Sequence, residues 1–141
     1  MLVISLVLQP KDINQGNPAW KILVVDDEPA ISTTIKLMLE ADGHTVQTAD
    51  SGREALVLLE KFKFDLVTTD FKMAGMKGDT LAAAIKERLP NQPVLMISIN
   101  GALAKAAGDP LPGVDLVISK PFRWEDLRKA IAIVLPEISL D

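Results

Sequence analysis

Two hydrophobic patterns alternate along the chain, and together they predict its secondary structure. Short apolar runs rich in Val, Ile and Leu, such as KILVV at 21–25, are typical of strands buried in a parallel sheet. Between these runs, apolar residues recur every three or four positions, as they do on one face of a helix. The predicted strands are 21–25, 45–49, 64–69 (ending at Asp70), 94–97 and 116–118. Four regular helices are predicted. The first begins at Pro29, and the second begins after Ser51, which forms a capping box with Glu54. The third is capped by Asp79, and the last begins at Trp124 and ends near Leu135.

The regular alternation of strands and helices predicts an α/β fold, with a mainly parallel sheet and helices on both faces. Right-handed crossovers and five strands favour the flavodoxin-like, doubly wound order 2-1-3-4-5. Glycines and prolines crowd residues 101–115, so we expect the fourth helix to be short or irregular. We assign 20–136 to this domain, 1–19 to an N-terminal tail or linker and 137–141 to a C-terminal tail.

Polar residues stand where four of the predicted strands end. Asp26 and Asp27 follow the first strand, Asp70 the third, Ser98 the fourth and Lys120 the fifth. Because doubly wound sheets bind ligands beyond the carboxyl ends of their strands, these side chains should share one site. Three adjacent carboxylates repel one another unless they share protons or hold a cation, and an all-oxygen ligand set favours Mg²⁺. A lysine and a hydroxyl suit the oxygens of a phosphoryl group, so the residues predict phosphoryl chemistry on an aspartate with magnesium.

The composition excludes several other kinds of site. The chain has no cysteine, which rules out disulfides and thiolate metal sites, and its single histidine, His44, rules out a histidine-rich metal site. A net charge of −4 and a pI of about 5.0 argue against direct binding to nucleic acid. The apolar segment 1–8 is too short to span a membrane, and it lacks the basic region and cleavage site of a signal peptide. We therefore expect a cytoplasmic protein that does not associate with membranes.

Four short motifs stand in order along the chain. They are VVDDEP with its acid pair, DFKMAGMKG beginning at Asp70, VLMIS ending at Ser98, and KPF beginning at Lys120. Each motif is common by itself, but together, at these separations, they make residues 21–135 resemble the receiver domain of two-component response regulators. The second motif is close to the family pattern D-x-x-M-P-G-M-x-G. The resemblance implies the flavodoxin-like fold and a role in phosphorelay signalling.

The resemblance also implies which residues hold the phosphoryl group and the metal. Asp70 would accept a phosphoryl group from a phosphohistidine of a sensor histidine kinase or a histidine phosphotransfer protein. Asp27 and Asp70 would ligate Mg²⁺ directly, Asp26 would act largely through water, and the backbone carbonyl of Lys72 would complete the protein ligands.

Two further residues would contact the phosphoryl group itself. Lys120, which is followed by a cis proline in such receivers, would pair with the phosphoryl oxygens. Ser98 would hydrogen-bond the group and, by moving, report its arrival to one face of the domain. That face is built from the irregular helix expected in 101–115, the strand 116–118 and the helix that begins at Trp124.

Three positions depart from the family pattern. Ala74 replaces the proline of the second motif, and we expect this change to loosen the loop without removing a metal ligand. Ile99 follows Ser98 where the family usually has a small residue, and a branched side chain there can crowd the approach of a phosphodonor or water. Val117 takes the place of the usual Tyr or Phe, so coupling between the hydroxyl residue and an aromatic ring is not available.

We therefore expect a single-domain receiver that promotes only its own phosphorylation and dephosphorylation, and is not an enzyme with a separate substrate. Its output would be a switched interaction with a downstream target protein, and a dimer is compatible with the sequence. The alternative is a degenerate receiver that acts as a scaffold independently of phosphorylation. A haloacid-dehalogenase-like phosphatase would need D-x-D where DFK stands, and a flavodoxin-like nucleotide binder would need a glycine-rich loop after the first strand.

Overall fold

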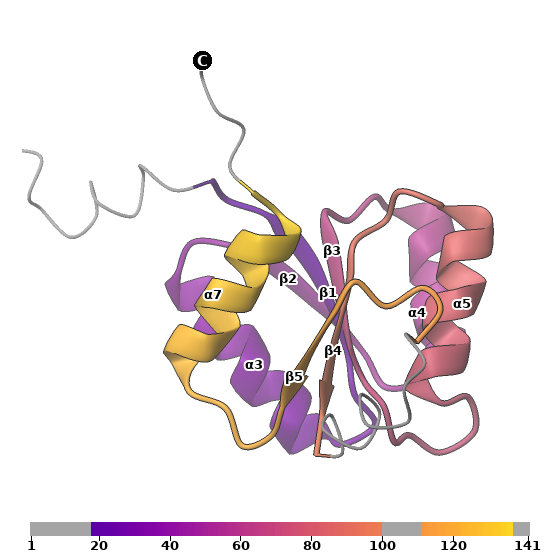
Figure 1. The fold of residues 1–141 in the computed structure, drawn as a ribbon, viewed down its shortest axis with the longest axis horizontal. Helices are drawn as coiled ribbons and strands as arrows, with labels where there is room; N and C mark the ends of the chain where they lie inside the picture. Colours follow the sequence, from indigo (N-terminus) through magenta and orange to yellow (C-terminus); the bar gives the residue numbers. More distant parts are fainter. Residues whose placement is uncertain (1–17, 100–110, 137–141) are drawn as a thin grey trace, which may run out of the picture.

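The computed structural model describes residues 18–99 and 111–136, which form a sheet covered by helices on both faces (Figure 1). The strands are β1 (Lys21–Val25), β2 (Thr45–Ala49), β3 (Leu66–Asp70), β4 (Val94–Ser98) and β5 (Leu116–Ser119). The helices are α3 (Pro29–Ala41), α4 (Gly52–Lys61), α5 (Gly78–Arg88) and α7 (Trp124–Val134). Neighbouring strands are parallel, and their order β2-β1-β3-β4-β5 confirms the predicted doubly wound, flavodoxin-like topology.

The sheet separates two apolar cores, because successive residues of a strand point to opposite faces. In β1, Ile22 and Val24 pack with residues of α3 and α7, whereas Leu23 and Val25 pack with residues of α4 and α5. All four side chains are buried, which explains why β1 is apolar throughout rather than at alternate positions. Figure 1 shows the same division, with α3 and α7 on one side of the sheet and α4 and α5 on the other.

Local signals in the sequence define where two of the helices begin and end. The Ser51 hydroxyl accepts a hydrogen bond from the Glu54 N–H at 3.0 Å, as the capping box predicts. The Glu54 carboxylate accepts the return bond from the N–H of Asp50 at 2.7 Å, one residue earlier than the usual capping box. Pro29 is the first residue of α3, and Gly43 follows the end of that helix with a φ of 94°, which favours glycine.

The start of β3 differs from its predicted position. The strand begins at Leu66, two residues after the predicted start at Phe64. The Asp65 carboxylate accepts a hydrogen bond from the Lys21 N–H at 2.8 Å, and the Asp65 N–H donates to the Lys21 carbonyl at 2.7 Å, so one backbone bond and one side-chain bond join the two segments at this point. Phe64 is nevertheless buried, so its apolar character is explained by packing rather than by strand pairing.

Two helix ends also differ from the prediction. Phe62 and Leu89 continue the apolar spacing of the predicted helices, but they are the residues that follow α4 and α5, and both are partly exposed. Asp79 lies inside the first turn of α5, where Lys77 takes the N-cap position. A carboxylate in the first turn still stabilises a helix, because it interacts favourably with the helix dipole.

Parts of the predicted organisation lie outside the described residues. They include most of the irregular helix expected in 101–115, most of the tail 1–19 and all of the tail 137–141. Residues 111–115 form a turn in which the Val114 N–H donates to the Leu111 carbonyl at 3.1 Å. Over 18–99 and 111–136, no helix has the length and apolar character needed to cross a membrane.

Candidate functional site

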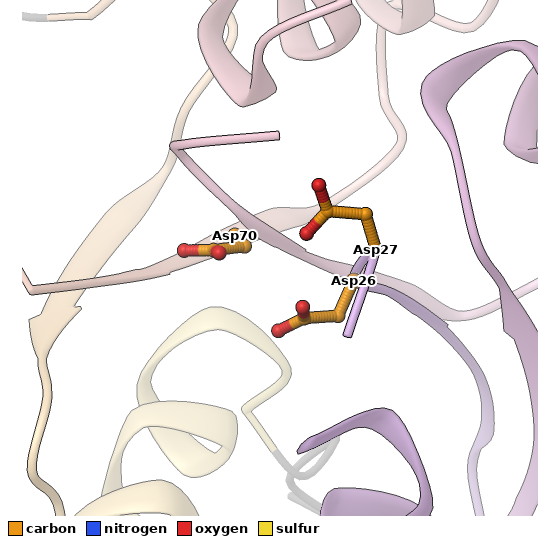
Figure 2. A group of neighbouring side chains, drawn as sticks. All are labelled: Asp26, Asp27 and Asp70. Carbon is orange, nitrogen blue, oxygen red and sulfur yellow. The ribbon is translucent and has the colours of Figure 1, made fainter. Parts of the chain in front are cut away.

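The carboxyl ends of β1 and β3 bring three aspartates together. The two strands pair with Val25 opposite Thr69, so the next residues, Asp26 and Asp70, lie at the same edge of the sheet. Asp27 follows directly, and one carboxylate oxygen of each aspartate lies within 4.8 Å of the others. Figure 2 shows the three side chains grouped together. The structure thus confirms that the acids predicted from the strand ends share one place.

Lys120 brings an amine to two of these carboxylates. Its Nζ lies 3.6 Å from Oδ2 of Asp26 and 3.5 Å from Oδ1 of Asp70. The backbone N–H of Lys120 donates to the Ser98 carbonyl at 3.0 Å, which holds the end of β5 beside β4. The Lys120–Pro121 peptide bond is cis, as the resemblance implies. The amine therefore neutralises part of the negative charge of the cluster.

Asp26 has an unusual environment for a carboxylate, because only 2% of its surface is exposed. Burial raises the pKa of Asp26 above its ordinary value. A hydrogen bond from the Glu28 N–H at 2.9 Å and the charge of Lys120 lower this pKa in part, whereas the charges of Asp70 and Asp27 raise it. The cluster therefore carries a surplus of negative charge that a cation would relieve.

Backbone N–H groups orient the other two carboxylates. The Phe71 N–H donates to Oδ1 of Asp70 at 2.9 Å. The Ala74 N–H donates to Oδ2 of Asp27, also at 2.9 Å and across 47 positions of the sequence. From the sequence we expect Ala74 to loosen this loop, and that expectation stays a prediction. Residue types do not predict the bond to Asp27, because any residue except proline can supply a backbone donor. The sequence signal for this bond is that Ala74, which has an N–H, stands where the family motif has proline.

Two glycines shape the loop that runs from Asp70 to α5. Gly78 donates its N–H to the Phe71 carbonyl at 2.9 Å, and a Cβ at Gly78 would collide with the Asp70 carbonyl oxygen. Gly75 has a φ of 78°, in the left-handed region that favours glycine. The glycines of the DFKMAGMKG motif are therefore required by the path of the backbone around the site.

The remaining predicted residues lie nearby but contribute differently. Ser98 ends β4, the strand that pairs with β3 beside Asp70, and it is 3% exposed. Ile99 follows it and is 74% exposed. Lys72 is exposed in the loop after β3, and the role of its carbonyl as a metal ligand stays a prediction.

Known proteins share this sequence pattern. Residues 22–132 match the family model of the response regulator receiver domain. The chemotaxis protein CheY-3 of Vibrio cholerae is 36% identical over 118 residues, a match that covers 82% of this chain and 91% of CheY-3. The transcriptional regulatory protein GlrR of Escherichia coli is 36% identical over 110 residues, and this match covers 78% of the chain but only 25% of GlrR. The chain therefore spans about a quarter of the length of that larger relative.

Solved structures share the fold. The chemotaxis protein CheY4 of Vibrio cholerae has a TM-score of 0.77 and 31% sequence identity, over 84% of this chain and 100% of that one. The response regulator TrrA of Thermotoga maritima, solved in complex with Mg²⁺ and BeF, has a TM-score of 0.73 and 29% identity, over 82% and 98% of the two chains. With the aspartate cluster and the family match over 22–132, these likenesses lead to one conclusion: the chain belongs to the receiver domains of two-component response regulators, a family of phosphorylation-based signalling domains.

Proposed function

We propose that this receiver domain works in a phosphorelay, in which Asp70 accepts a phosphoryl group from a phosphohistidine. The donor would be a sensor histidine kinase or a histidine phosphotransfer protein. The observation that carries the proposal is the place of the Asp70 carboxylate, which lies beside two other aspartates and 3.5 Å from the amine of Lys120. Asp70 also ends β3, at the edge where doubly wound sheets bind their ligands.

The donor set of the site fits Mg²⁺. The carboxylates of the cluster offer only oxygen ligands, and Mg²⁺ prefers oxygen and bridges readily to phosphates. We assign the metal to Asp26, Asp27 and Asp70, together with the backbone carbonyl of Lys72. When bound, the ion would neutralise charge that develops on the transferring phosphoryl group. The related TrrA was solved in complex with Mg²⁺ and BeF, which supports the choice of Mg²⁺ as the metal.

In the proposed transfer, an oxygen of the Asp70 carboxylate attacks the phosphorus of the phosphohistidine. A P–O bond forms while the P–N bond breaks, and the electron pair of that bond stays on the imidazole nitrogen. The amine of Lys120, already beside Asp70, pairs with the arriving phosphoryl oxygens. The hydroxyl of Ser98, at the end of the neighbouring strand, donates a hydrogen bond to the same group.

Phosphorylation would be read by another protein. The phosphoryl group adds negative charge and strong acceptor oxygens at one edge of the sheet. Ser98 and Lys120 stand at the ends of β4 and β5, so their rearrangement around the group would alter the surface that these strands border. We infer that this surface switches the binding of a downstream target in the cytoplasm. The domain would modify only itself, without a separate substrate and without direct contact with nucleic acid or membrane.

Intact-protein mass spectrometry with a small-molecule phosphodonor tests the proposal. The wild-type chain should gain one phosphoryl group in the presence of Mg²⁺ and none after the metal is chelated. Asp70→Asn should gain none, because the amide is nearly the same size but is not a nucleophile. Asp79→Asn is the matched control, since Asp79 lies in the first turn of α5 outside the cluster, and it should be modified like the wild type. Modification that persists in Asp70→Asn, or that ignores Mg²⁺, would contradict the proposal.

A second candidate function, a scaffold that binds its partner without phosphorylation, is favoured by Ile99. This side chain is 74% exposed next to Ser98, where a branched residue can crowd the approach of a phosphodonor. Val117, at a position where receivers often carry an aromatic residue, also favours the scaffold, because the usual coupling to an aromatic ring is not available. The scaffold predicts no phosphoryl gain under conditions that modify a control receiver. If Ile99 blocks the donor, Ile99→Ala should then restore the modification.

A further inference from the structure

We propose that the backbone N–H of Ala74 holds the Asp27 carboxylate in position to ligate the metal, which makes Ala74 a positioning residue of the magnesium site. The inference rests on the proposed function, because it concerns the affinity of that site for Mg²⁺. It adds to the ligand set a donor that the motif D-x-x-M-P-G-M-x-G does not provide, since proline has no N–H at the position of Ala74.

Two carboxylates of the cluster are each held by more than one group. Asp26 accepts a hydrogen bond from the Glu28 N–H at 2.9 Å, and Asp70 accepts one from the Phe71 N–H at 2.9 Å. Lys120 adds an ion pair to both, at 3.6 Å and 3.5 Å respectively. Both residues are also buried, at 2% and 8% exposure, so little room remains for their side chains to turn away.

Asp27 is held differently. Within the part of the chain that the structure describes, the ion pairs of Lys120 go to the other two aspartates, and the hydrogen bond to Asp27 comes from Ala74 at 2.9 Å. This bond joins the loop after β3 to the end of β1. It uses one lone pair of Oδ2, so the carboxylate can still ligate a cation.

The bond matters because the three carboxylates repel one another when no cation is bound. Asp27 is only half-buried, and repulsion favours rotation of its side chain toward water. A fixed N–H donor opposes that rotation, so less ordering is needed when the metal arrives. Groups that orient a metal ligand typically change metal affinity by about 10–100-fold. We place the effect of Ala74 at about tenfold, because Ala74 is exposed to solvent.

Isothermal titration with Mg²⁺ tests the inference on the wild type, Ala74→Pro and Ala74→Ser. The proline variant loses the N–H and should bind Mg²⁺ about tenfold more weakly. The serine variant keeps the N–H and a small side chain, so its affinity should match the wild type. Thermal unfolding of all three shows whether the proline variant is folded.

Phosphorylation kinetics separate positioning from general damage. With a small-molecule phosphodonor, Ala74→Pro should raise the Mg²⁺ concentration that gives half the maximal rate, and should leave the rate at saturating Mg²⁺ close to that of wild type. A merely structural defect would lower the saturated rate instead, and that result would overturn the inference.

Amide hydrogen exchange tests the bond directly, without any need for the proline variant to fold. The Ala74 N–H should exchange slowly in the wild type, despite its exposed position, and faster in Asp27→Ala. Equal exchange in the two proteins would overturn the inference. Equal Mg²⁺ affinity of the wild type and a folded Ala74→Pro would also overturn the inference, but it would leave the proposed function intact. A wild-type chain that does not bind Mg²⁺ would overturn both.

Discussion

Single residues set the charge balance of the site, and Lys120 supplies the positive charge that pairs with two of its aspartates. Its side chain is 15% exposed, so solvent screens its charge only weakly from Asp26 and Asp70. In the metal-free protein, the amine offsets part of the repulsion among the carboxylates. The same charge must oppose the binding of a divalent cation to those carboxylates.

Lys120→Ala should therefore bind Mg²⁺ more tightly than the wild type, even though it loses a group proposed to contact the phosphoryl oxygens. Unit charges about 4 Å apart interact by about 1 kcal/mol in water and about 4 kcal/mol near a protein surface, so we expect roughly tenfold. Isothermal titration with Mg²⁺ at one fixed pH measures the change. Lys120→Arg keeps the charge and serves as the control. An affinity in Lys120→Ala at or below that of wild type would contradict this account.

Residue types alone predict the acids and the lysine, because each stands at a strand end next to a recognisable apolar run. The pairing of Asp27 with Ala74 is different in kind. It joins a carboxylate to a backbone N–H 47 positions away, and the identity of the donor residue carries almost no information about it. Only the path of the loop determines which N–H group meets the carboxylate.

At the scale of elements, the junction between β3 and α5 sets the position of Asp70. Gly78 begins α5, and a Cβ there would collide with the Asp70 carbonyl oxygen and lie 2.9 Å from Cα of Phe71. Both contacts are with backbone, which cannot move without shifting the end of β3. Gly52, the first residue of α4, differs, since the three atoms nearest to a Cβ there all belong to the Met76 side chain.

Gly78→Ala should consequently lower the free energy of unfolding by about 1–3 kcal/mol, as overpacking typically does, and should slow the phosphorylation of Asp70. Gly52→Ala should cost less than about 1 kcal/mol, because the flexible Met76 side chain can rearrange around the new methyl group. Urea denaturation of the two variants gives the comparison, and both substitutions sit at the same position of a helix. Equal losses of stability would show that backbone contact at Gly78 is not the cause.

The boundaries of elements were partly predictable from the sequence. Pro29 and Ser51 mark helix starts correctly, because their effect on the backbone is local. The start of β3 was not predictable, because one of the two hydrogen bonds between Lys21 and Asp65 uses the Asp65 side chain in place of a backbone carbonyl. That contact depends on the arrangement of two segments far apart in the sequence.

At the scale of the whole molecule, α3 and α7 are joined on the face of the sheet that they share. The Asp42 carboxylate, after the end of α3, accepts hydrogen bonds from Nε and Nη2 of Arg128 at 2.8 Å and 2.7 Å, and from Nε1 of Trp124 at 3.0 Å. The Arg128 guanidinium also lies 4.7 Å from the centroid of the Trp124 ring. These contacts link the first helix of the domain to the last.

The pKa of Asp42 follows from this environment. Burial by itself would raise the pKa, but the hydrogen bonds from Arg128 and Trp124, with the charges of Arg128 and His44, hold the pKa of Asp42 below its ordinary 3.8. Because the pKa is lower in the folded state, the ionised carboxylate stabilises the fold above about pH 3.8, and this contribution is lost as the pH falls through the lowered value. His44 lies next to this group, and burial lowers its pKa from 6.5. Protonation of His44 in acid therefore also destabilises the folded state.

Asp42→Asn should reduce the stability of the domain at neutral pH by about 1 kcal/mol, a modest value because solvent screens the exposed Arg128. The difference between wild type and variant should shrink as the pH falls below about 3.8. Urea denaturation at several pH values measures it. Taking the difference between the unfolding free energies of the two proteins removes most of the contribution of His44, which both contain. A difference that stays constant in acid would show that the ion pair is not its source.

The sequence by itself determined the class of fold, the strand order, the family and the residues of the acidic site. It could do so because apolar periodicity, capping residues and strand-end acids act locally, and because parallel strands bring their carboxyl ends to one edge. Tertiary structure alone decided that Ala74 donates to Asp27, that Lys120 pairs with Asp26 and Asp70, and that Asp42 joins α3 to α7. Those contacts arise between segments that are distant in sequence. Their partners are selected by the three-dimensional course of loops and helices, which no local pattern of residues encodes.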